Sequence, residues 1–226
     1  ARTQSKLDDA VSEISQTAVG TIEGISCDVS NGDAVKAAFG QILAKHGKVD
    51  ILVNNAGHGN ANTFDTLDEE MLDEDLQLKV YGGMFCSKAV LPGMRAQKWG
   101  RIINITTAAG KAAGYSTLPT AMSRAAGIAM TKSMSKEYGA DNILVNTVCI
   151  GSIRSAQNLR HAEAAVSAGE VATTEEYYVE RCKTVPVLRV GEAREAGDLI
   201  AFLASDRASY ISGTAINMDG GAAPVV

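Results

Sequence analysis

Short apolar runs alternate with longer helical stretches along nearly the whole chain, and this alternation limits the possible folds more than any other feature. Strands that alternate with helices of roughly ten or more residues predict a parallel sheet with helices on both faces, the doubly wound α/β class. The apolar runs predict strands over residues 21–29, 48–57, 101–107, 142–150 and 214–221.

The segments between these runs predict the helices. Ser30 is a candidate amino-terminal cap, with Asp33 three residues later, and the helix that follows is expected to end near Gly47. No internal repeat or low-complexity linker interrupts the pattern, so residues 1–226 are expected to form one domain. The other helices are predicted over residues 3–16, 67–97, 118–139, 156–183 and 191–204. Residues 67–97 are expected to form one or two helices, and residues 156–183 an irregular one.

Parallel sheets of this class bind ligands beyond the carboxyl ends of their strands, where the strand order reverses. Gly57 and Gly59 directly follow the end of a predicted strand. A side chain at either position would block a ligand lying over the sheet, but the two glycines suit a simple turn equally well. Both interpretations stay open.

The composition gives no support to two classes of partner. The chain has a net charge of −5, and its 21 basic residues form no dense cluster, so nucleic acid is not expected to bind. No apolar run approaches the ~18 residues of a membrane span, and the polar start of the chain does not resemble a signal peptide. Apolar residues make up 46% of the chain, which is enough for a substantial core.

The four cysteines, Cys27, Cys86, Cys149 and Cys182, lie far apart and form no Cys-x-x-Cys pair. We interpret them as free, mostly buried thiols rather than as disulfides or zinc ligands. Free thiols predict a reducing compartment, the cytoplasm. The three histidines share no metal-ligand spacing, so no metal site is expected.

Several segments occur in a fixed order that points to a family. The sequence Asn-Asn-Ala-Gly at residues 54–57 follows an apolar strand, and four further segments surround it: residues 27–29, 101–105, 141–148 and 211–221. This ordered set, which extends over the whole chain, resembles the short-chain dehydrogenase/reductase family and in particular its 3-oxoacyl-carrier-protein-reductase-like branch.

The resemblance implies a Rossmann-like fold and an NAD(P)-dependent oxidoreductase that acts on a carbonyl or alcohol substrate. Residues 152–186 resemble the family's substrate lid. The helices over 67–97 and 118–139, the second rich in alanine, resemble the pair through which members form dimers and tetramers, although both also suit packing on this chain's own sheet. The implied cofactor-binding residues are Asp28, Val29, Asn55, Ala56, Gly57, Arg124 and Gly151.

The strand, glycine-rich turn and helix with which the family begins have no counterpart in this sequence. Residues 57–62 contain two glycines but open no helix, so we reject them as a substitute. Ala1 and Arg2 resemble the end of the family's second strand. We therefore expect a sheet without the first two strands and a chain that is a fragment lacking about 30–40 residues. The alternative is a naturally short chain whose sheet closes differently.

Arg2 bears on the choice of cofactor. It follows the position at which NAD-preferring members of the family carry an acidic residue, and Ala1 occupies that position here. An arginine without the carboxylate favours a 2′-phosphate, so the resemblance implies NADP slightly ahead of NAD. A solvated arginine at the start of a helix is the equally open alternative.

The family's proton-transfer residues are replaced in this chain. By spacing, Thr107 takes the serine position, Thr120 the tyrosine position, Arg124 the lysine position and Lys79 the position of a structural asparagine. A tyrosine has a pKa of ~10, which a nearby ammonium lowers, whereas the aliphatic hydroxyl of a threonine is far less acidic. Arg124 stays protonated and is no proton relay. Lys79 suits an ammonium near the site or a lysine on a helix surface.

Three functions follow from these replacements. The first is an NAD(P)-dependent oxidoreductase with weak or altered catalysis. The second is a non-catalytic member of the family that binds a ligand or a partner chain, which the aliphatic hydroxyl of Thr120 favours. The third is a dehalogenase or lyase that needs no nicotinamide. The sequence does not identify the substrate, and Tyr115, five residues before Thr120, is a weak candidate for the missing tyrosine.

Overall fold

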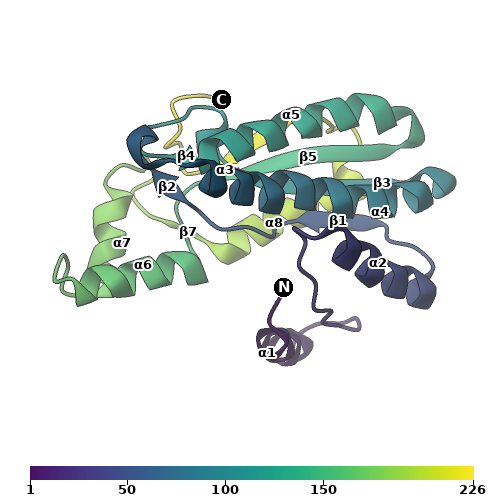
Figure 1. Ribbon diagram of the computed structural model, residues 1–226, viewed down its shortest axis with the longest axis horizontal. Coiled ribbons are helices and arrows are strands. Elements are labelled where there is room, and N and C mark those ends of the chain that lie inside the picture. The colour runs from purple at the N-terminus through teal and green to yellow at the C-terminus, as the bar shows by residue number, and fades with distance from the viewer.

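A four-stranded parallel sheet forms the centre of the computed structural model, which describes residues 1–226 (Figure 1). β3 (Gly100–Thr107) and β5 (Ile143–Ile150) pair along their full length and are buried almost throughout. β1 (Ile51–Asn54) flanks β3, and β8 (Ala215–Met218) flanks β5. The predicted α/β class with a parallel sheet is confirmed.

Helices cover both faces of the sheet (Figure 1). α4 (Gly82–Gln97) and α5 (Thr120–Tyr138) pack on one face, and α8 (Ala193–Ala204) packs on the other. Successive residues of a strand point to opposite faces. Ile102 therefore lies in the apolar cluster under α4 and α5, whereas Ile103 lies in the cluster under α8.

Smaller elements surround this centre. The π-helical turn η2 (Gln77–Tyr81) joins α3 (Glu69–Leu76) to α4. α6 (Ala156–Ser167) and α7 (Thr174–Cys182) pack on each other at one end of the sheet, within the predicted lid (Figure 1). The remaining elements are α1 (Gln4–Ser15), α2 (Gly32–His46), η1 (Phe64–Thr66), η3 (Ala108–Gly110), η4 (Gly139–Asp141), η5 (Asp206–Ala208), β2 (Ala61–Asn62), β4 (Leu118–Pro119), β6 (Ile153–Arg154) and β7 (Gly191–Glu192).

The strand predicted over residues 21–29 does not form, so that prediction is wrong. A strand needs a hydrogen-bonded partner along its length, and no strand of the sheet pairs with this segment. One backbone hydrogen bond joins the segment to the start of the chain: the N–H of Cys27 donates to the carbonyl oxygen of Ala1, at 2.9 Å. β1 consequently has a neighbour on one side only, and Ile51 and Val53 are 45% and 37% exposed.

Several predicted boundaries also change. The cap of α2 is Asn31, whose side-chain oxygen accepts from the N–H groups of Asp33 and Ala34, because the hydroxyl of Ser30 donates to Asp28 instead. α2 ends before Gly47, as predicted. Of the one or two helices predicted over 67–97, two form, joined by the π-helical turn, and the helix predicted over 156–183 is two helices.

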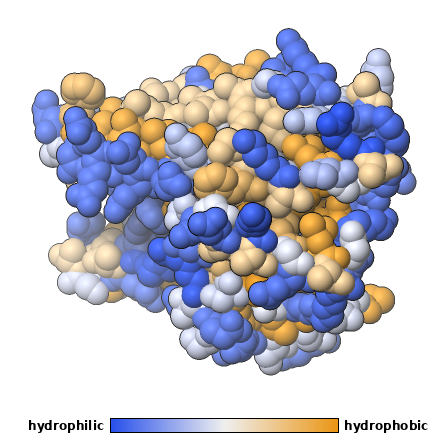
Figure 2. Space-filling model, turned by 45° about the vertical axis from the view of Figure 1, so that its right-hand side comes forward, coloured by the Kyte–Doolittle hydropathy of each residue, from blue (hydrophilic) through white to orange (hydrophobic).

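The surface mixes polar and apolar residues. Figure 2 shows apolar residues gathered in the upper part of one face, with charged and polar residues around and below them. The four cysteines are free. None of the helices combines the length and the apolar character needed to cross a lipid bilayer.

Candidate active site

A cleft opens at the carboxyl ends of β1, β3 and β5, where ligands of such sheets bind. Five of the site residues predicted from their spacing in the sequence line this one cleft: Gly57, Thr107, Thr120, Arg124 and Gly151. α6 and the segment before it close the opposite wall. The N–H of Gly59 donates to Oε1 of Gln157 at 3.1 Å, which joins the loop after β1 to α6.

The hydroxyl of Thr120, at the start of α5, accepts two hydrogen bonds. The backbone N–H of Asn60 donates to it at 2.9 Å, and Nζ of Lys79 donates at 3.0 Å. A hydroxyl oxygen has two acceptor positions, and both are filled here. The hydroxyl's own proton is therefore left for a further acceptor, and Thr120 lines the cleft.

Lys79 lies behind Thr120 in a buried ion pair. Its ammonium contacts Oδ1 of Asp75 one turn earlier, and both side chains are 1% exposed. The hydroxyl of Ser123 donates to Oδ2 of the same carboxylate at 2.5 Å. The interpretation of Lys79 as a surface lysine is therefore wrong, because the π-helical turn and α5 enclose it.

The environment of Lys79 favours a proton donor. Burial lowers the pKa of its ammonium below the ordinary value, the hydrogen bond that the ammonium donates to Asp75 opposes this change, and the positive charge of Arg124 lowers the pKa further. Desolvation penalises the charged form, so a buried ammonium gives up its proton more readily than one in water.

Asp75 was missed by the sequence analysis. Five carboxylates lie within residues 69–75, and nothing in the sequence shows which of them is buried. The spacing of four residues between Asp75 and Lys79 was the available signal, because side chains so spaced meet on a helix. Tyr115, in contrast, is 90% exposed and does not line the cleft.

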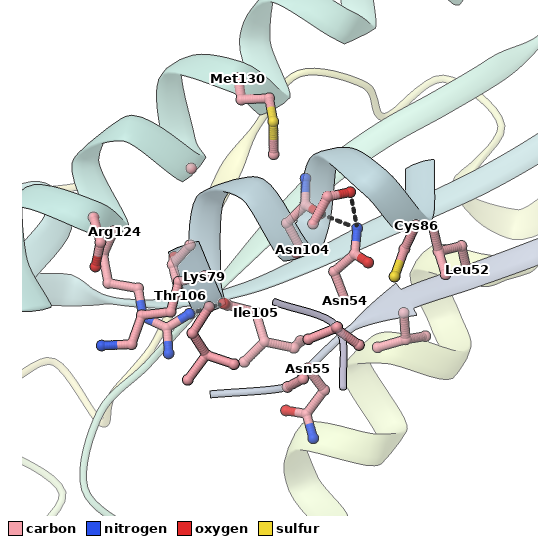
Figure 3. A pocket seen from close by; sticks show the side chains of 18 residues that line it. Leu52, Asn54, Asn55, Lys79, Cys86, Asn104, Ile105, Thr106, Arg124 and Met130 are labelled. Carbon is pink, nitrogen blue, oxygen red and sulfur yellow. Dashed lines mark hydrogen bonds between the residues drawn. The ribbon is translucent and has the colours of Figure 1, made fainter. Parts of the chain in front are cut away.

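Arg124 points from α5 toward the end of β3 (Figure 3). Its Nη1 donates to the carbonyl oxygen of Ile105 at 2.7 Å, while its Nε is buried without a partner. Burial lowers the pKa of the guanidinium and the charge of Asp75 opposes this, but an arginine remains a cation in any case. A Cβ on Gly57 would lie 3.0 Å from Nη2 of Arg124, so glycine leaves room for this side chain.

A chain of buried polar groups fixes the floor of the site. Nδ2 of Asn54 donates to Oδ1 of Asn104 at 2.8 Å (Figure 3). Nδ2 of Asn104 in turn donates to the hydroxyl of Thr131 at 2.8 Å. The hydroxyls of Thr131 and Thr147 are 2.7 Å apart. These bonds join β1, β3 and β5 to one another through α5, so they hold the three strands and this helix in a fixed arrangement. None of these four residues was predicted from the sequence to have this role.

The predicted cofactor-binding residues fall in adjoining pockets. Asn55 lines both the cleft and a deeper pocket between β1, β3 and the helices, which Val29, Ala56, Lys79 and Arg124 also line (Figure 3). Gly151 approaches its own chain closely, because a Cβ there would lie 2.5 Å from Cβ of Asp219.

Arg2 and Asp28 line a separate pocket with Ser30, Gln77 and Tyr81. The nearest guanidinium and carboxylate atoms of Arg2 and Asp28 are 3.9 Å apart, and Arg2 is 73% exposed. Hydrogen bonds from the side chain and backbone of Ser30 hold the pKa of Asp28 below its ordinary value. His58 lines both this pocket and the cleft, so the two sites adjoin.

Comparisons with known proteins agree with this architecture. A family model described as enoyl-(acyl carrier protein) reductase matches residues 1–223. The oxidoreductase UcpA of Salmonella typhimurium is 35% identical over 198 residues, which cover 87% of this chain and 74% of that protein. The 3-oxoacyl-[acyl-carrier-protein] reductase FabG of Staphylococcus epidermidis is 30% identical over 221 residues, which cover 98% of this chain and 85% of that protein.

Two solved structures superpose over the whole chain. L-sorbose reductase from Gluconobacter frateurii, in complex with NADPH and L-sorbose, has a TM-score of 0.93 at 26% identity, and 86% of that chain is covered. YwfH, an NADPH-dependent reductase involved in bacilysin biosynthesis, has a TM-score of 0.90 at 26% identity, and 87% of that chain is covered. Fold and matches together define a Rossmann-fold oxidoreductase of the NAD(P)-dependent kind. The chain belongs to the short-chain dehydrogenase/reductase family, in its 3-oxoacyl-carrier-protein-reductase-like branch.

Proposed function

We propose that this chain reduces a small-molecule carbonyl compound with NADPH, or runs the reverse oxidation of an alcohol, and that Thr120 replaces tyrosine as the group that contacts the substrate oxygen. The proposal rests on the hydrogen bonds of the Thr120 hydroxyl. It accepts one from Lys79 and one from the backbone N–H of Asn60, so its own proton can be donated to a group bound in the cleft.

The residues of the cleft fit the nicotinamide end of the cofactor. Oγ1 of Thr107 and Nε of Arg124 are buried polar atoms without a partner. Such an atom costs about 1–3 kcal/mol, so a ligand in the cleft that hydrogen-bonds to either of them would remove that cost. Asn55, Ala56 and Gly151 would lie along the ribose and nicotinamide, and Asp28 and Val29 at the adenine.

The preference for NADPH over NADH rests on Arg2. Its guanidinium is 73% exposed and lies 3.9 Å from Asp28, a distance that leaves most of its donors free. A 2′-phosphate would bind these donors. YwfH is described as NADPH-dependent, and L-sorbose reductase was solved with NADPH, which supports the same choice.

Each side chain then has a distinct role. The cofactor, when bound, supplies the hydride that the carbonyl carbon accepts. Thr107 and Thr120 bind the carbonyl oxygen, and Thr120 gives it a proton as negative charge develops. Lys79 returns a proton to Thr120 through their 3.0 Å hydrogen bond, and solvent later reprotonates Lys79. Because a threonine is a much weaker acid than a tyrosine, we expect turnover to be slow.

Replacement of Thr120 by valine tests the proposal. Valine keeps the branched shape of the side chain and removes the hydroxyl, so carbonyl reduction should fall about 100-fold, as general acid catalysis is lost. NADPH oxidation in the presence of a panel of ketones measures the rate, and the exposed Thr66→Val is the matched control. Equal rates for the wild-type protein and Thr120→Val would exclude this role.

The reverse experiment introduces the tyrosine and the lysine that the family carries at positions 120 and 124. Thr120→Tyr with Arg124→Lys should raise carbonyl reduction, because a phenol beside two ammonium groups is a stronger proton donor than a threonine. No gain in a variant that still binds NADPH would count against the assignment of these two positions.

A non-catalytic, ligand-binding protein is the second candidate. Arg124 supports it, because its guanidinium is tied to the carbonyl oxygen of Ile105 at 2.7 Å rather than free for a ribose. A titration of NADPH fluorescence separates the two candidates. Tight binding without turnover of any ketone favours the second candidate, and no binding at all removes the first.

A further inference from the structure

The arginines of this chain divide into two groups. Six of the ten lie within 4.0 Å of a carboxylate: Arg2, Arg95, Arg101, Arg154, Arg189 and Arg194. Four have no such partner: Arg124, Arg160, Arg181 and Arg207. Three of these four, Arg124, Arg160 and Arg181, line the same cleft, the one into which Thr120 points.

Arg160 and Arg181 lie on the two helices of the lid, and most of their guanidinium N–H donors have no partner. Arg160 is exposed near the end of the first half of α6 and makes no side-chain hydrogen bond. Arg181, on α7, reaches the hydroxyls of Tyr177 and Ser152, each at 3.4 Å, which is long for a hydrogen bond. A guanidinium has five N–H donors, so most of them remain available in both side chains.

The cleft has little negative charge to balance these cations. Asp219 is the one carboxylate among its lining residues. Its Oδ1 accepts from the N–H of Gly221 at 2.9 Å, and its Oδ2 accepts from the N–H of Ala223 at 2.8 Å. The cleft therefore gathers three cations against one occupied carboxylate, in a chain whose net charge is −5.

We propose that Arg160 and Arg181 bind an anionic group of the substrate, a carboxylate or a phosphate, while Thr120 contacts the carbonyl oxygen. This inference rests on the proposed function and names its substrate class: an oxo acid or a phosphorylated carbonyl compound. The phosphates of the cofactor are the other source of the same chemistry. Because both arginines belong to the lid, whereas Arg2 and Asp28 lie in a separate pocket, the geometry favours the substrate.

The test compares 4-oxopentanoate with its methyl ester, two ketones that differ by one charge. We expect the wild-type protein to have a KM for the acid about tenfold below that for the ester, as one charge-assisted contact provides. Arg160→Gln with Arg181→Gln should remove this difference. Arg207→Gln, the fourth unpaired arginine and one outside the cleft, is the control and should keep it.

The outcomes separate the possible errors. Equal KM values for acid and ester in the wild-type protein would overturn the inference. A higher KM for NADPH in the double variant, with the acid-to-ester ratio retained, would assign the arginines to the cofactor instead. If no ketone is reduced, equilibrium dialysis with labelled 4-oxopentanoate still decides: weaker binding to the double variant than to Arg207→Gln supports the anion site, and equal binding refutes it.

Discussion

The ammonium of Lys79 should control the pH dependence of carbonyl reduction. Burial lowers its pKa below the ordinary 10.5. Below the lowered pKa the lysine is protonated and supplies Thr120, and above it the supply is lost, so kcat should fall as pH rises through this value. Lys79→Gln should be slower and should lack this alkaline decline. A decline that persists unchanged in Lys79→Gln would assign it to another group.

Removing one partner of the buried ion pair between Asp75 and Lys79 should lower the stability of the fold substantially. Lys79→Met leaves the carboxylate of Asp75 buried without its cation, and we expect a loss of about 3–5 kcal/mol in the free energy of unfolding. Asp75→Leu with Lys79→Met removes both charges and should recover much of this loss. Urea denaturation measures both.

Two observations would qualify that result. Lys45→Met breaks the exposed contact with Glu23 and should change stability little, so it serves as the control. If the double variant is as unstable as Lys79→Met, the cost lies in packing rather than in the unpaired charge.

The positions of the site residues could largely be predicted, but their partners could not. Spacing from the family motifs brought Thr107, Thr120, Arg124 and Lys79 to one site. The burial of Lys79 against Asp75 depends on how the π-helical turn packs on α5, and one sequence does not show that contact.

At the scale of elements, apolar runs predicted strands well where neighbours exist on both sides. β3 and β5 follow their predicted ranges within a residue, because each lies between two paired strands under helices. Residues 21–29 also contain apolar residues that suit a strand, but no neighbouring strand pairs with them. The sequence pattern indicates which residues suit a strand, whereas strand pairing depends on whether another strand lies next to them in the fold.

Amide hydrogen exchange checks this difference. Amides of β3 and β5 should exchange slowly, because both strands are paired on each side and buried. Amides of residues 21–26 should exchange orders of magnitude faster, since no ladder protects them. Protection of that segment equal to that of β3 would show that it pairs in solution.

At the scale of the whole molecule, we expect a homodimer or homotetramer built through α4 and α5. Met122, on α5, is 45% exposed, so its side chain is available to a second chain that packs on this helix. Met122→Asp should shift the molar mass measured by light scattering toward that of one chain. Val179→Asp, at a side chain 50% exposed on the lid, should leave the assembly intact. A monomeric wild-type protein would contradict this prediction.

The two bonds accepted by Thr120 also bear on stereochemistry. They fix the direction of its remaining proton, so a bound carbonyl group has one favoured orientation in the cleft. A nicotinamide held against Gly151, as proposed, would then present its hydride to one face of the carbonyl carbon. Under the proposed function, the alcohol formed in this cleft should accordingly have a single handedness.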